Sequence, residues 1–309
     1  MDKTARAFGQ IYTDTNPFKL EPFQRWAHEA GIFKKTILEP FAGANNLIRH
    51  LETLHLCKQY SAFDIAPAAA DVLPQDTLAD FPSGFDVCIT NPPWLAKNSA
   101  TVRGLTFPEC EYDDLYKFSL SRCLAHCGYV AALIPEAFIR SGLFQDRLTD
   151  FISICSRLFL DTGHPTGLAL FTPQPTADIR LWADDSFIGN YHELKARHLP
   201  QNSEKNRKVR FNAKDGGLGL IAFDNVREAS IRFCSIDEIA DYEIKPTSRF
   251  ITRIWTETCP SVAALNAYLA ELRDNTGDVF LSSYRGLRKD GLYRRRLDWN
   301  LARKIISSS

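Results

Sequence analysis

Apolar residues recur along the first 190 residues with the periods of an α-helix and of buried strands. Phe23, Trp26, Ala27 and Ala30 stand at positions i, i+3, i+4 and i+7, which predicts one apolar helix face over residues 22–30. Short, nearly continuous apolar runs follow, as in strands covered on both faces. Strands are predicted at Ile37–Leu38 and in YSAFDIAP, DVCIT, YVAALIP and GLALF, and further helices at LIRHLETL, residues 113–126 and residues 144–154.

Strands that alternate with helices in this way predict an α/β fold, with a doubly wound and mostly parallel sheet. Residues 191–309 are less regular. They contain a turn-rich hairpin candidate, FNAKDGGLGLIAFDN, and one clear helical pattern, SVAALNAYLAELRD. We therefore predict a first domain over residues 1–190 and a smaller region over residues 191–309, with the boundary falling between about 180 and 200.

Composition is that of a soluble globular protein. Of the 309 residues, 45% are hydrophobic and 24% charged. No run approaches the roughly 20 apolar residues of a membrane span, and the N-terminus has no apolar signal core, so we expect a cytoplasmic protein without a membrane partner. The eight cysteines include no CxxC pair, which favours reduced core thiols and argues against a metal site.

The zero net charge conceals an asymmetry. Residues 1–192 hold 16 Lys/Arg and 22 Asp/Glu, whereas residues 193–309 hold 21 Lys/Arg and 15 Asp/Glu, so the two parts carry −6 and +6. The second part therefore suits an acidic partner, although chance placement of a few charges would give the same difference.

A glycine-bearing turn follows the first predicted strand, in LEPFAGANN (residues 38–46). Such a turn into a helix offers free N–H groups to a ligand. Asp64 ends the next strand, 21 residues beyond Gly43, where nucleotide-binding α/β folds carry the acidic residue that accepts from the ribose hydroxyls. Together they favour an adenosine-bearing cofactor; a plain strand–helix turn and a helix cap are the alternatives.

The third buried strand ends on Asn91-Pro92-Pro93-Trp94. Asn91 offers an amide oxygen as acceptor. Pro92 lacks an N–H and fixes the direction of its own carbonyl, and Trp94 offers a flat face for stacking. Two acceptors beside a stacking surface suit the exocyclic amine of a planar ring. A rigid strand exit is the other interpretation.

With these residues the sequence resembles the N6-adenine-specific DNA methyltransferases that use S-adenosylmethionine. The matching motifs cover most of the first 180 residues in the order of the gamma group: GQIYT, LEPFAG, FDIAP, QDTL, NPPW and GYVAALIPEAF. The resemblance implies a Rossmann-like methyltransferase domain followed by a target-recognition region. The pair Asn45-Asn46 departs from the family, which usually has another glycine there.

The resemblance also implies roles for single residues. Thr13 and Glu39 would contact the methionine end of the cofactor, together with the turn residues Phe41 and Gly43. Asp64 would hold the ribose, and Asp76 would accept from the adenine amine. The catalytic set would be Asn91, Pro92, Pro93 and Trp94, acting on a flipped-out adenine.

Lysine and arginine residues that follow the NPPW motif in the sequence suit contact with the phosphates of double-stranded DNA. The loop after NPPW, read as a lid, carries Lys97 and Arg103, and the predicted DNA-binding residues of the second part are Arg249, Arg253, Arg285, Arg288, Lys289, Arg294, Arg295 and Arg296. A separate restriction endonuclease is a candidate partner. The alternatives are an RNA-guanine or protein-glutamine N-methyltransferase with the same motif, or a catalytically silent nucleic-acid-binding subunit.

Overall fold

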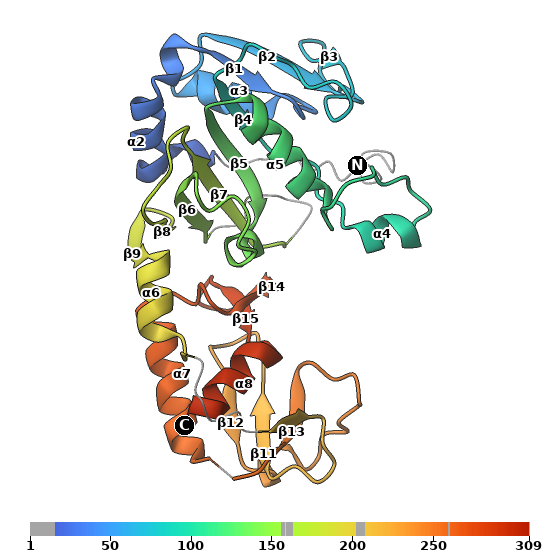
Figure 1. Cartoon of the computed structure of the whole chain (residues 1–309), viewed down its shortest axis with the longest axis vertical. Coiled ribbons are helices and arrows are strands. Elements are labelled where there is room, and N and C mark those ends of the chain that lie inside the picture. Colours follow the sequence, from blue (N-terminus) through green and yellow to red (C-terminus); the bar gives the residue numbers. More distant parts are fainter. Residues whose placement is uncertain (1–15, 156–157, 159–162, 202–207, 259, 309) are drawn as a thin grey trace. The chain divides into compact units, whose positions relative to one another are not determined.

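The computed structural model describes residues 16–155, 158, 163–201, 208–258 and 260–308. The predicted cofactor residue Thr13, with the rest of GQIYT, lies outside this range. The chain divides into two compact units, residues 1–187 and 188–309 (Figure 1). The division predicted from the sequence fell after residue 190.

Unit 1 is built on a nine-stranded sheet with the order β3-β2-β1-β4-β5-β7-β6-β8-β9. Its strands are β1 (Thr36–Glu39), β2 (Gln59–Asp64), β3 (Leu73–Pro74), β4 (Val87–Thr90), β5 (Tyr129–Pro135), β6 (Leu148–Ile154), β7 (Thr166–Phe171), β8 (Arg180–Ala183) and β9 (Ser186–Asn190). The first five are parallel neighbours, and β7 runs antiparallel between β5 and β6. The helical elements are η1 (Pro17–Lys19), α2 (Glu21–Ala30), η2 (Ile32–Lys34), α3 (Asn46–Thr53), α4 (Lys97–Val102), α5 (Leu115–His126) and η3 (Glu136–Arg140).

Helices cover both faces of this sheet. Alternate strand residues such as Ile37 and Ile89 join one apolar cluster with Trp26 of α2 and Ile48 of α3. Their neighbours point the other way, where Cys88 meets the α5 thiol Cys123. Figure 1 shows α2 and α5 on opposite sides of β5. The predicted doubly wound, mostly parallel α/β fold is therefore confirmed, and the predicted strands match β1, β2, β4, β5 and β7.

The helix predicted over residues 144–154 is wrong, because this segment contains strand β6. Leu148, Phe151 and Ile152 have helical spacing, but β6 pairs with β7 on one side and β8 on the other. Buried residues also occur on both faces of β6, where only Thr149 and Ser153 are partly exposed, so the alternation that marks a strand disappears. Asp150 is 0% exposed within the strand because its carboxylate accepts hydrogen bonds from Arg25 and Arg180, and from the Trp182 indole.

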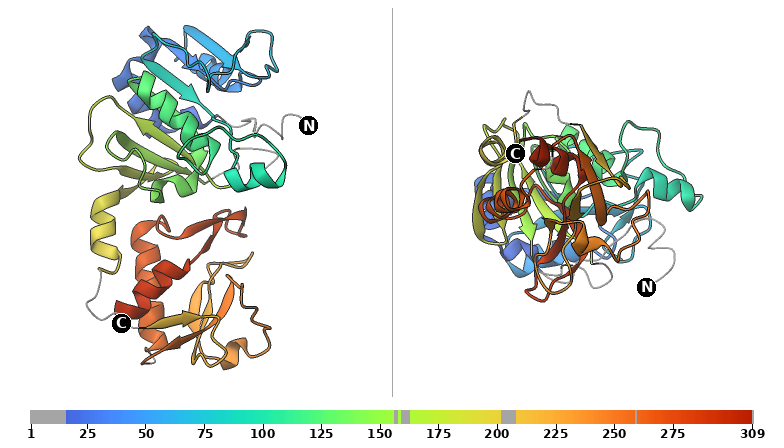
Figure 2. Two further views of the ribbon diagram at one scale, coloured as in Figure 1. Left: turned by 45° about the vertical axis from the view of Figure 1, so that its right-hand side comes forward. Right: turned by 90° about the horizontal axis from the view of Figure 1, so that it is seen from below.

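Unit 2 combines a four-stranded antiparallel sheet, ordered β10-β13-β11-β12, with a separate two-stranded ribbon, β14-β15. The strands are β10 (Val209–Phe211), β11 (Leu218–Ile221), β12 (Arg232–Cys234), β13 (Ile251–Thr256), β14 (Ser282–Leu287) and β15 (Tyr293–Arg296). The helical elements are α6 (Tyr191–His198), η4 (Asp237–Ile239), α7 (Val262–Thr276) and α8 (Trp299–Ser308), of which α7 contacts β12 and α8 contacts β10 (Figure 2).

The helix predicted in SVAALNAYLAELRD is confirmed as α7, and Ser261 caps it by accepting from the Ala264 N–H. The hairpin predicted in FNAKDGGLGLIAFDN is wrong. β10 and β11 do not pair with each other, because β13 lies between them and pairs with both. Gly216 makes this insertion feasible, since a Cβ there would stand 2.7–2.8 Å from backbone atoms of Ile254.

Candidate active site

Three strands of unit 1 end side by side at the carboxyl edge of the large sheet. Glu39 is the last residue of β1, Asp64 of β2 and Thr90 of β4. β1 lies between β2 and β4 and is parallel to both, so the three residues share one edge. In the sheet, β2 and β3 follow on one side of β1, and β4 and β5 follow on the other side. The β1–β4 boundary is therefore the topological switch point, where open α/β sheets bind ligands.

The turn after β1 is held directly by the acidic residue of β2. The Gly43 N–H donates to Asp64 Oδ2 over 2.8 Å, and the Ala66 N–H donates to Asp64 Oδ1 over 2.8 Å. Gly43 has φ +53°, a left-handed conformation that glycine adopts without strain. Asp64 is 4% exposed. Gly43 and Asp64 therefore belong to one structural unit, as their spacing suggested.

Asn45, one of the pair that departs from the methyltransferase motif, takes a left-handed backbone conformation. It has φ +62° and ψ +28° at the N-cap of α3, and asparagine is the non-glycine residue best suited to that region. Its Nδ2 donates to Asp71 Oδ2 over 2.8 Å, which lowers the pKa of the Asp71 carboxyl. The departure noted in the sequence thus preserves the backbone of the turn.

Glu39 is the most unusual ionisable group of this edge. Its side chain is 0% exposed, and Oε1 accepts from the Thr90 hydroxyl over 2.7 Å and from the Phe41 N–H over 3.1 Å. Within the described residues, Oε2 is buried without a hydrogen-bond partner. Burial raises the pKa of Glu39 to about 8, despite the two hydrogen bonds. The side chain is therefore a neutral acid at pH 7 that a nearby cation would ionise.

The segment QDTL is tied to the same turn. The Thr77 hydroxyl donates to the Pro40 carbonyl over 2.8 Å and is buried. Asp76 is exposed, and its Oδ1 accepts from the N–H groups of Leu78 and Ala79. Asp76 therefore caps a local turn, and Thr77 keeps that turn beside the exit of β1.

The NPPW segment leaves β4 immediately after Thr90, whose hydroxyl contacts Glu39. Pro92 is buried, while Asn91, Pro93 and Trp94 are partly exposed. The Trp94 ring packs against the apolar cluster of the sheet and meets His164 edge-on, with ring centroids 6.4 Å apart. The segment thus begins at the switch point, within one residue of the Glu39 contact.

Asp114 fixes the direction of the chain after Trp94. Its Oδ1 accepts from the Leu95 N–H over 3.1 Å and also caps α5 through the Tyr116 N–H. The Leu115 N–H donates to the Leu95 carbonyl. Burial raises the pKa of Asp114 to about 6. A single carboxylate therefore positions both the NPPW exit and the start of α5.

The predicted lid contains the short helix α4. Lys97 begins this helix, and its Nζ lies 5.9 Å from the centroid of the Phe107 ring. Arg103 caps the C-terminal end and is exposed. Val102 is 88% exposed. Both cations face solvent on this segment, and their predicted contact with phosphates stays a prediction.

The predicted DNA-binding residues of unit 2 fall into two groups. Arg249, Arg285 and Lys289 are exposed, and Arg296 is partly exposed. Arg253 lines a pocket of about 200 Å³ together with Asn212, Lys214, Tyr242 and Ile244. These cations face solvent or an open pocket and are accessible to a partner.

The second group serves the interior of unit 2. Arg288 is 8% exposed and pairs with Asp224 and Asp290 at 3.0 and 2.8 Å, which corrects its prediction as a DNA contact. Arg294 donates to the Asp224 carbonyl, and its guanidinium carbon lies 5.0 Å from the Phe223 ring centroid. Arg295 donates from Nη1 to the Ser283 hydroxyl. Cations that are close in the sequence therefore differ in role: some are accessible to a partner, and others bind groups within unit 2.

Sequence reasoning missed Thr90, Thr77 and Asp114. Each carried a weak signal: Thr90 is the single polar residue that ends the buried run VCIT, Thr77 lies inside QDTL, and Asp114 precedes a helical pattern. Their partners are distant along the chain, which no local pattern reveals. No cluster of three or more His, Cys, Asp or Glu suited to a metal ion occurs in the described parts of the chain. None of the described helices is long and apolar enough to cross a membrane.

No family model and no curated protein matches the sequence. Among solved structures, a putative class I S-adenosylmethionine-dependent methyltransferase from Listeria monocytogenes is similar at 17% identity and a TM-score of 0.39, over 57% of this chain and 68% of that one. A type I restriction-modification methyltransferase subunit from Streptococcus thermophilus has 16% identity and a TM-score of 0.39, over 55% and 47%.

A third similar structure is the M protein of the type I restriction enzyme EcoKI, at 11% identity and a TM-score of 0.39, over 87% of this chain and 72% of that one. The chain spans less than half of the Streptococcus subunit. These identities and scores are low, so the function has to be argued from the residues of the site itself.

Proposed function

We propose that this protein is an S-adenosylmethionine-dependent DNA methyltransferase that acts on the N6 amine of a flipped-out adenine. One observation carries the proposal. The NPPW segment leaves β4 at the switch point of the sheet, and Thr90, the residue before it, is hydrogen-bonded to Glu39 at the end of β1. The motif that suits an amine thereby adjoins the turn that suits an adenosine cofactor.

The residues at this edge fit the proposed cofactor. Asp64 would accept from the ribose hydroxyls, because its carboxylate lies at the carboxyl end of β2, beside the Gly43 turn. Asp76 would accept from the adenine amine. The buried Oε2 of Glu39, without a partner among the described residues, would meet the cationic methionine end. When bound, the cofactor supplies a methyl group on a sulfonium, an electrophile that needs no metal ion.

The chain's own contribution to the reaction is positioning. The amide oxygen of Asn91 and the carbonyl of Pro92 would accept the two hydrogens of the target amine, which concentrates the nitrogen lone pair toward the methyl group. Pro93 limits the freedom of the segment. Most of the rate enhancement of such a transfer comes from holding the two reactants in line.

An adenine inside a duplex must leave the base stack before it can reach this edge, which costs about a few kcal/mol. Stacking on an aromatic side chain returns roughly 1–3 kcal/mol per base. Trp94 is the aromatic residue of the motif, and His164 meets its ring at an angle of 82°. We propose that Trp94 is the stacking surface for the flipped base.

The preference for DNA rests on unit 2. Its exposed cations, among them Arg249, Arg285 and Lys289, suit contact with phosphates. A separate restriction endonuclease would be the natural partner of such an enzyme, and the cytoplasm its expected location.

Asn91→Ala tests the catalytic assignment. Because Asn91 would contact the target amine and not the cofactor, the variant should lose at least about 100-fold in turnover, the scale of a lost transition-state hydrogen bond. Its S-adenosylmethionine affinity, measured by calorimetry, should stay within about twofold. Asn300→Ala, at an exposed asparagine on α8, is the matched control.

Full turnover in Asn91→Ala would show that another residue holds the amine. Wild-type protein that binds DNA but not S-adenosylmethionine would instead indicate a catalytically silent subunit. Methyl transfer only to RNA or to protein would favour the RNA-guanine or protein-glutamine alternative.

A further inference from the structure

The ribbon β14–β15 of unit 2 concentrates positive charge. Residues 282–296 contain six of the 21 Lys/Arg of residues 193–309 and a single acidic residue, Asp290. The two strands pair antiparallel, with Ser282 opposite Arg296 and Leu287 opposite Tyr293. They form their own two-stranded sheet, so the ribbon is not an edge of the larger four-stranded sheet.

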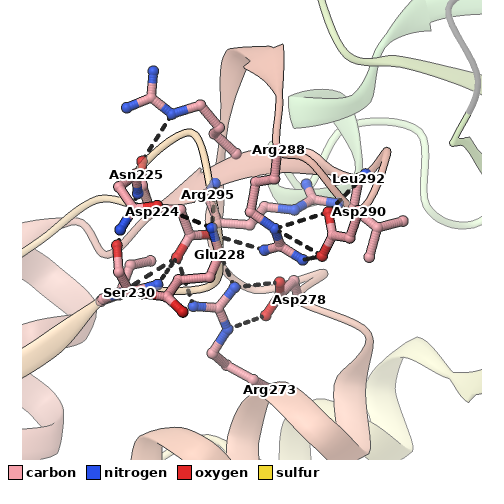
Figure 3. A network of polar contacts seen from close by, with 12 residues as sticks. Asp224, Asn225, Glu228, Ser230, Arg273, Asp278, Arg288, Asp290, Leu292 and Arg295 are labelled. Carbon is pink, nitrogen blue, oxygen red and sulfur yellow. Dashed lines mark hydrogen bonds and ion pairs between the residues drawn. The ribbon is translucent and has the colours of Figure 1, made fainter.

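A buried ionic network fixes the base of the ribbon tip (Figure 3). Asp224, 0% exposed, accepts from the guanidinium groups of Arg273 on α7 and Arg288 at the tip, over 2.9–3.0 Å. Arg273 also pairs with Asp278 and Arg288 with Asp290, each at 2.8 Å. Every charge in the network has an opposite charge beside it, as a buried ion requires.

Backbone hydrogen bonds lock the ribbon in the same place. The Arg295 N–H donates to Asp224 Oδ2, and the Asp224 N–H donates to the Arg295 carbonyl. At the tip the Lys289 N–H donates to the Val226 carbonyl over 3.0 Å. The tip is therefore held on two sides, by the network and by the loop that carries Val226.

An aromatic cluster supports the other end of the ribbon. Phe223, Phe250 and Tyr284 lie with ring centroids 4.9–6.4 Å apart. The Arg294 guanidinium carbon stands 5.0 Å and 5.3 Å from the centroids of Phe223 and Tyr284. Aromatic rings and a cation at these distances attract each other.

These contacts leave a defined set of groups exposed at the tip. Leu287 is 37%, Leu292 45% and Val226 57% exposed, although each is apolar. Lys289 stands between the two leucines in the turn and forms no ion pair or side-chain hydrogen bond within the described residues. Because the Arg288 guanidinium is bound within the network, the tip presents exposed apolar side chains around the ammonium group of Lys289.

We propose that the tip of the β14–β15 ribbon, residues 287–292 with Val226, enters the major groove of duplex DNA and reads its sequence. That groove admits a two-stranded β-ribbon. Lys289 contacts a phosphate or a guanine edge, and Leu287 and Leu292 contact thymine methyl groups. The inference rests on the proposed function, for which it supplies the sequence-reading element.

Charge complementarity selects DNA over a protein as the occupant. Apart from the buried Arg288, the ribbon carries five cations, of which Arg285 and Lys289 are exposed, whereas the fully buried core of a protein interface is depleted of charge. The rigid mounting serves the same end, because a reading element must hold its side chains in one geometry before it meets the base edges.

Selection of bound duplexes from a random DNA pool tests this inference on the full chain. Wild-type protein should enrich one sequence motif. The double variant Leu287→Ser/Leu292→Ser changes only exposed side chains and should bind DNA with a flattened motif. Lys289→Ala should weaken binding and reduce the slope of log K against log [salt] by about 0.9. Lys304→Ala, an exposed lysine on α8, should change neither motif nor slope by as much.

Ribbon variants that keep the wild-type motif and affinity would overturn the inference, as would a wild-type protein that binds no duplex. Duplexes in which uracil replaces thymine add a second test, because they lack the thymine methyl group that lies in the major groove. The replacement should weaken wild-type binding more than binding by the double variant, and an equal effect would contradict groove entry. If the wild-type protein selects a DNA motif but methylates no substrate, the inference about the ribbon stands and the proposed methyltransferase activity is refuted.

Discussion

At the residue scale, Glu39 connects the folding of the sheet to the proposed cofactor site. Among the described residues, one oxygen of this buried carboxyl group has no hydrogen-bond partner. An apolar side chain at this position would therefore give a more stable fold than glutamate does. Glu39 instead has two donors on Oε1 and none on Oε2. A cationic ligand that reached Oε2 would ionise the group and make use of this arrangement.

The raised pKa of Glu39 predicts a pH-dependent stability of the protein without ligand. Between pH 4.5 and about 8 the folded state keeps the Glu39 proton that the unfolded state has released. The free energy of unfolding therefore falls as pH rises through this window and levels off above it. The effect is a few kcal/mol, since one pKa unit corresponds to about 1.4 kcal/mol.

Glu39→Gln should remove this dependence. Thermal unfolding from pH 5 to 9 should show the variant gaining stability relative to wild type as pH rises, while its S-adenosylmethionine affinity falls. Glu52→Gln, on the surface of α3, is the control. A stability difference that stays constant from pH 5 to 9 would contradict the raised pKa.

At the scale of secondary-structure elements, the positions of the strands are easier to predict than which strands pair with each other. The apolar runs of β4 and β5 are evident because both faces are covered. The spacing between Gly43 and Asp64 predicts a ribose-binding acid, and the hydrogen bond between the two residues is an addition from the structure. The segment of β6 is mispredicted as a helix for the same reason, because buried residues occur on both of its faces and hide the strand alternation. Element type follows from local pattern, whereas pairing depends on residues far apart in the chain.

The same limit applies to the candidate site. NPPW and the acidic positions could be identified from sequence, yet Thr90 and Asp114, which orient that segment, could not. In the ribbon, the sequence predicts Arg288 as a DNA-binding residue alongside Arg285 and Lys289. Asp224, 64 residues before Arg288, decides which cation is buried. No local pattern carries that information.

Asp114 gives a prediction at this scale, because one carboxylate holds both the NPPW exit and α5. Burial raises its pKa to about 6. Between pH 3.8 and about 6 the folded state therefore binds more proton than the unfolded state, and stability falls as pH rises through that window. Asp114→Asn keeps an acceptor for the Leu95 N–H and an N-cap residue without the buried charge.

The variant should therefore be more stable than wild type at pH 7, by about 1–2 kcal/mol, and should lack the pH dependence between 4 and 6. Chemical denaturation at several pH values measures both effects. Asp113→Asn, at the neighbouring exposed carboxylate, is the control. Destabilisation of Asp114→Asn at pH 7 would mean that the carboxylate charge strengthens the Leu95 contact beyond its desolvation cost.

At the scale of the whole molecule, the two parts of the chain differ in net charge and in proposed role. Residues 1–192 carry a net −6 and hold the candidate active site, whereas residues 193–309 carry +6 and hold the ribbon. Cofactor binding should therefore be nearly insensitive to salt, and DNA binding strongly sensitive. If about four exposed cations contact phosphates, the slope of log K against log [salt] should be near −3.6. A slope near zero would exclude phosphate contacts as the source of DNA affinity.

We propose that Asn91 and Pro92 bind the N6 amine of an adenine in DNA. The most direct measurement uses S-adenosylmethionine with a labelled methyl group, the full chain, and duplex DNA, RNA and protein as separate substrates. The modified products are then digested and identified by mass spectrometry. We expect N6-methyladenine in duplex DNA treated with the wild-type protein and none in DNA treated with Asn91→Ala. Label found only in RNA, in protein or on another DNA base would contradict it.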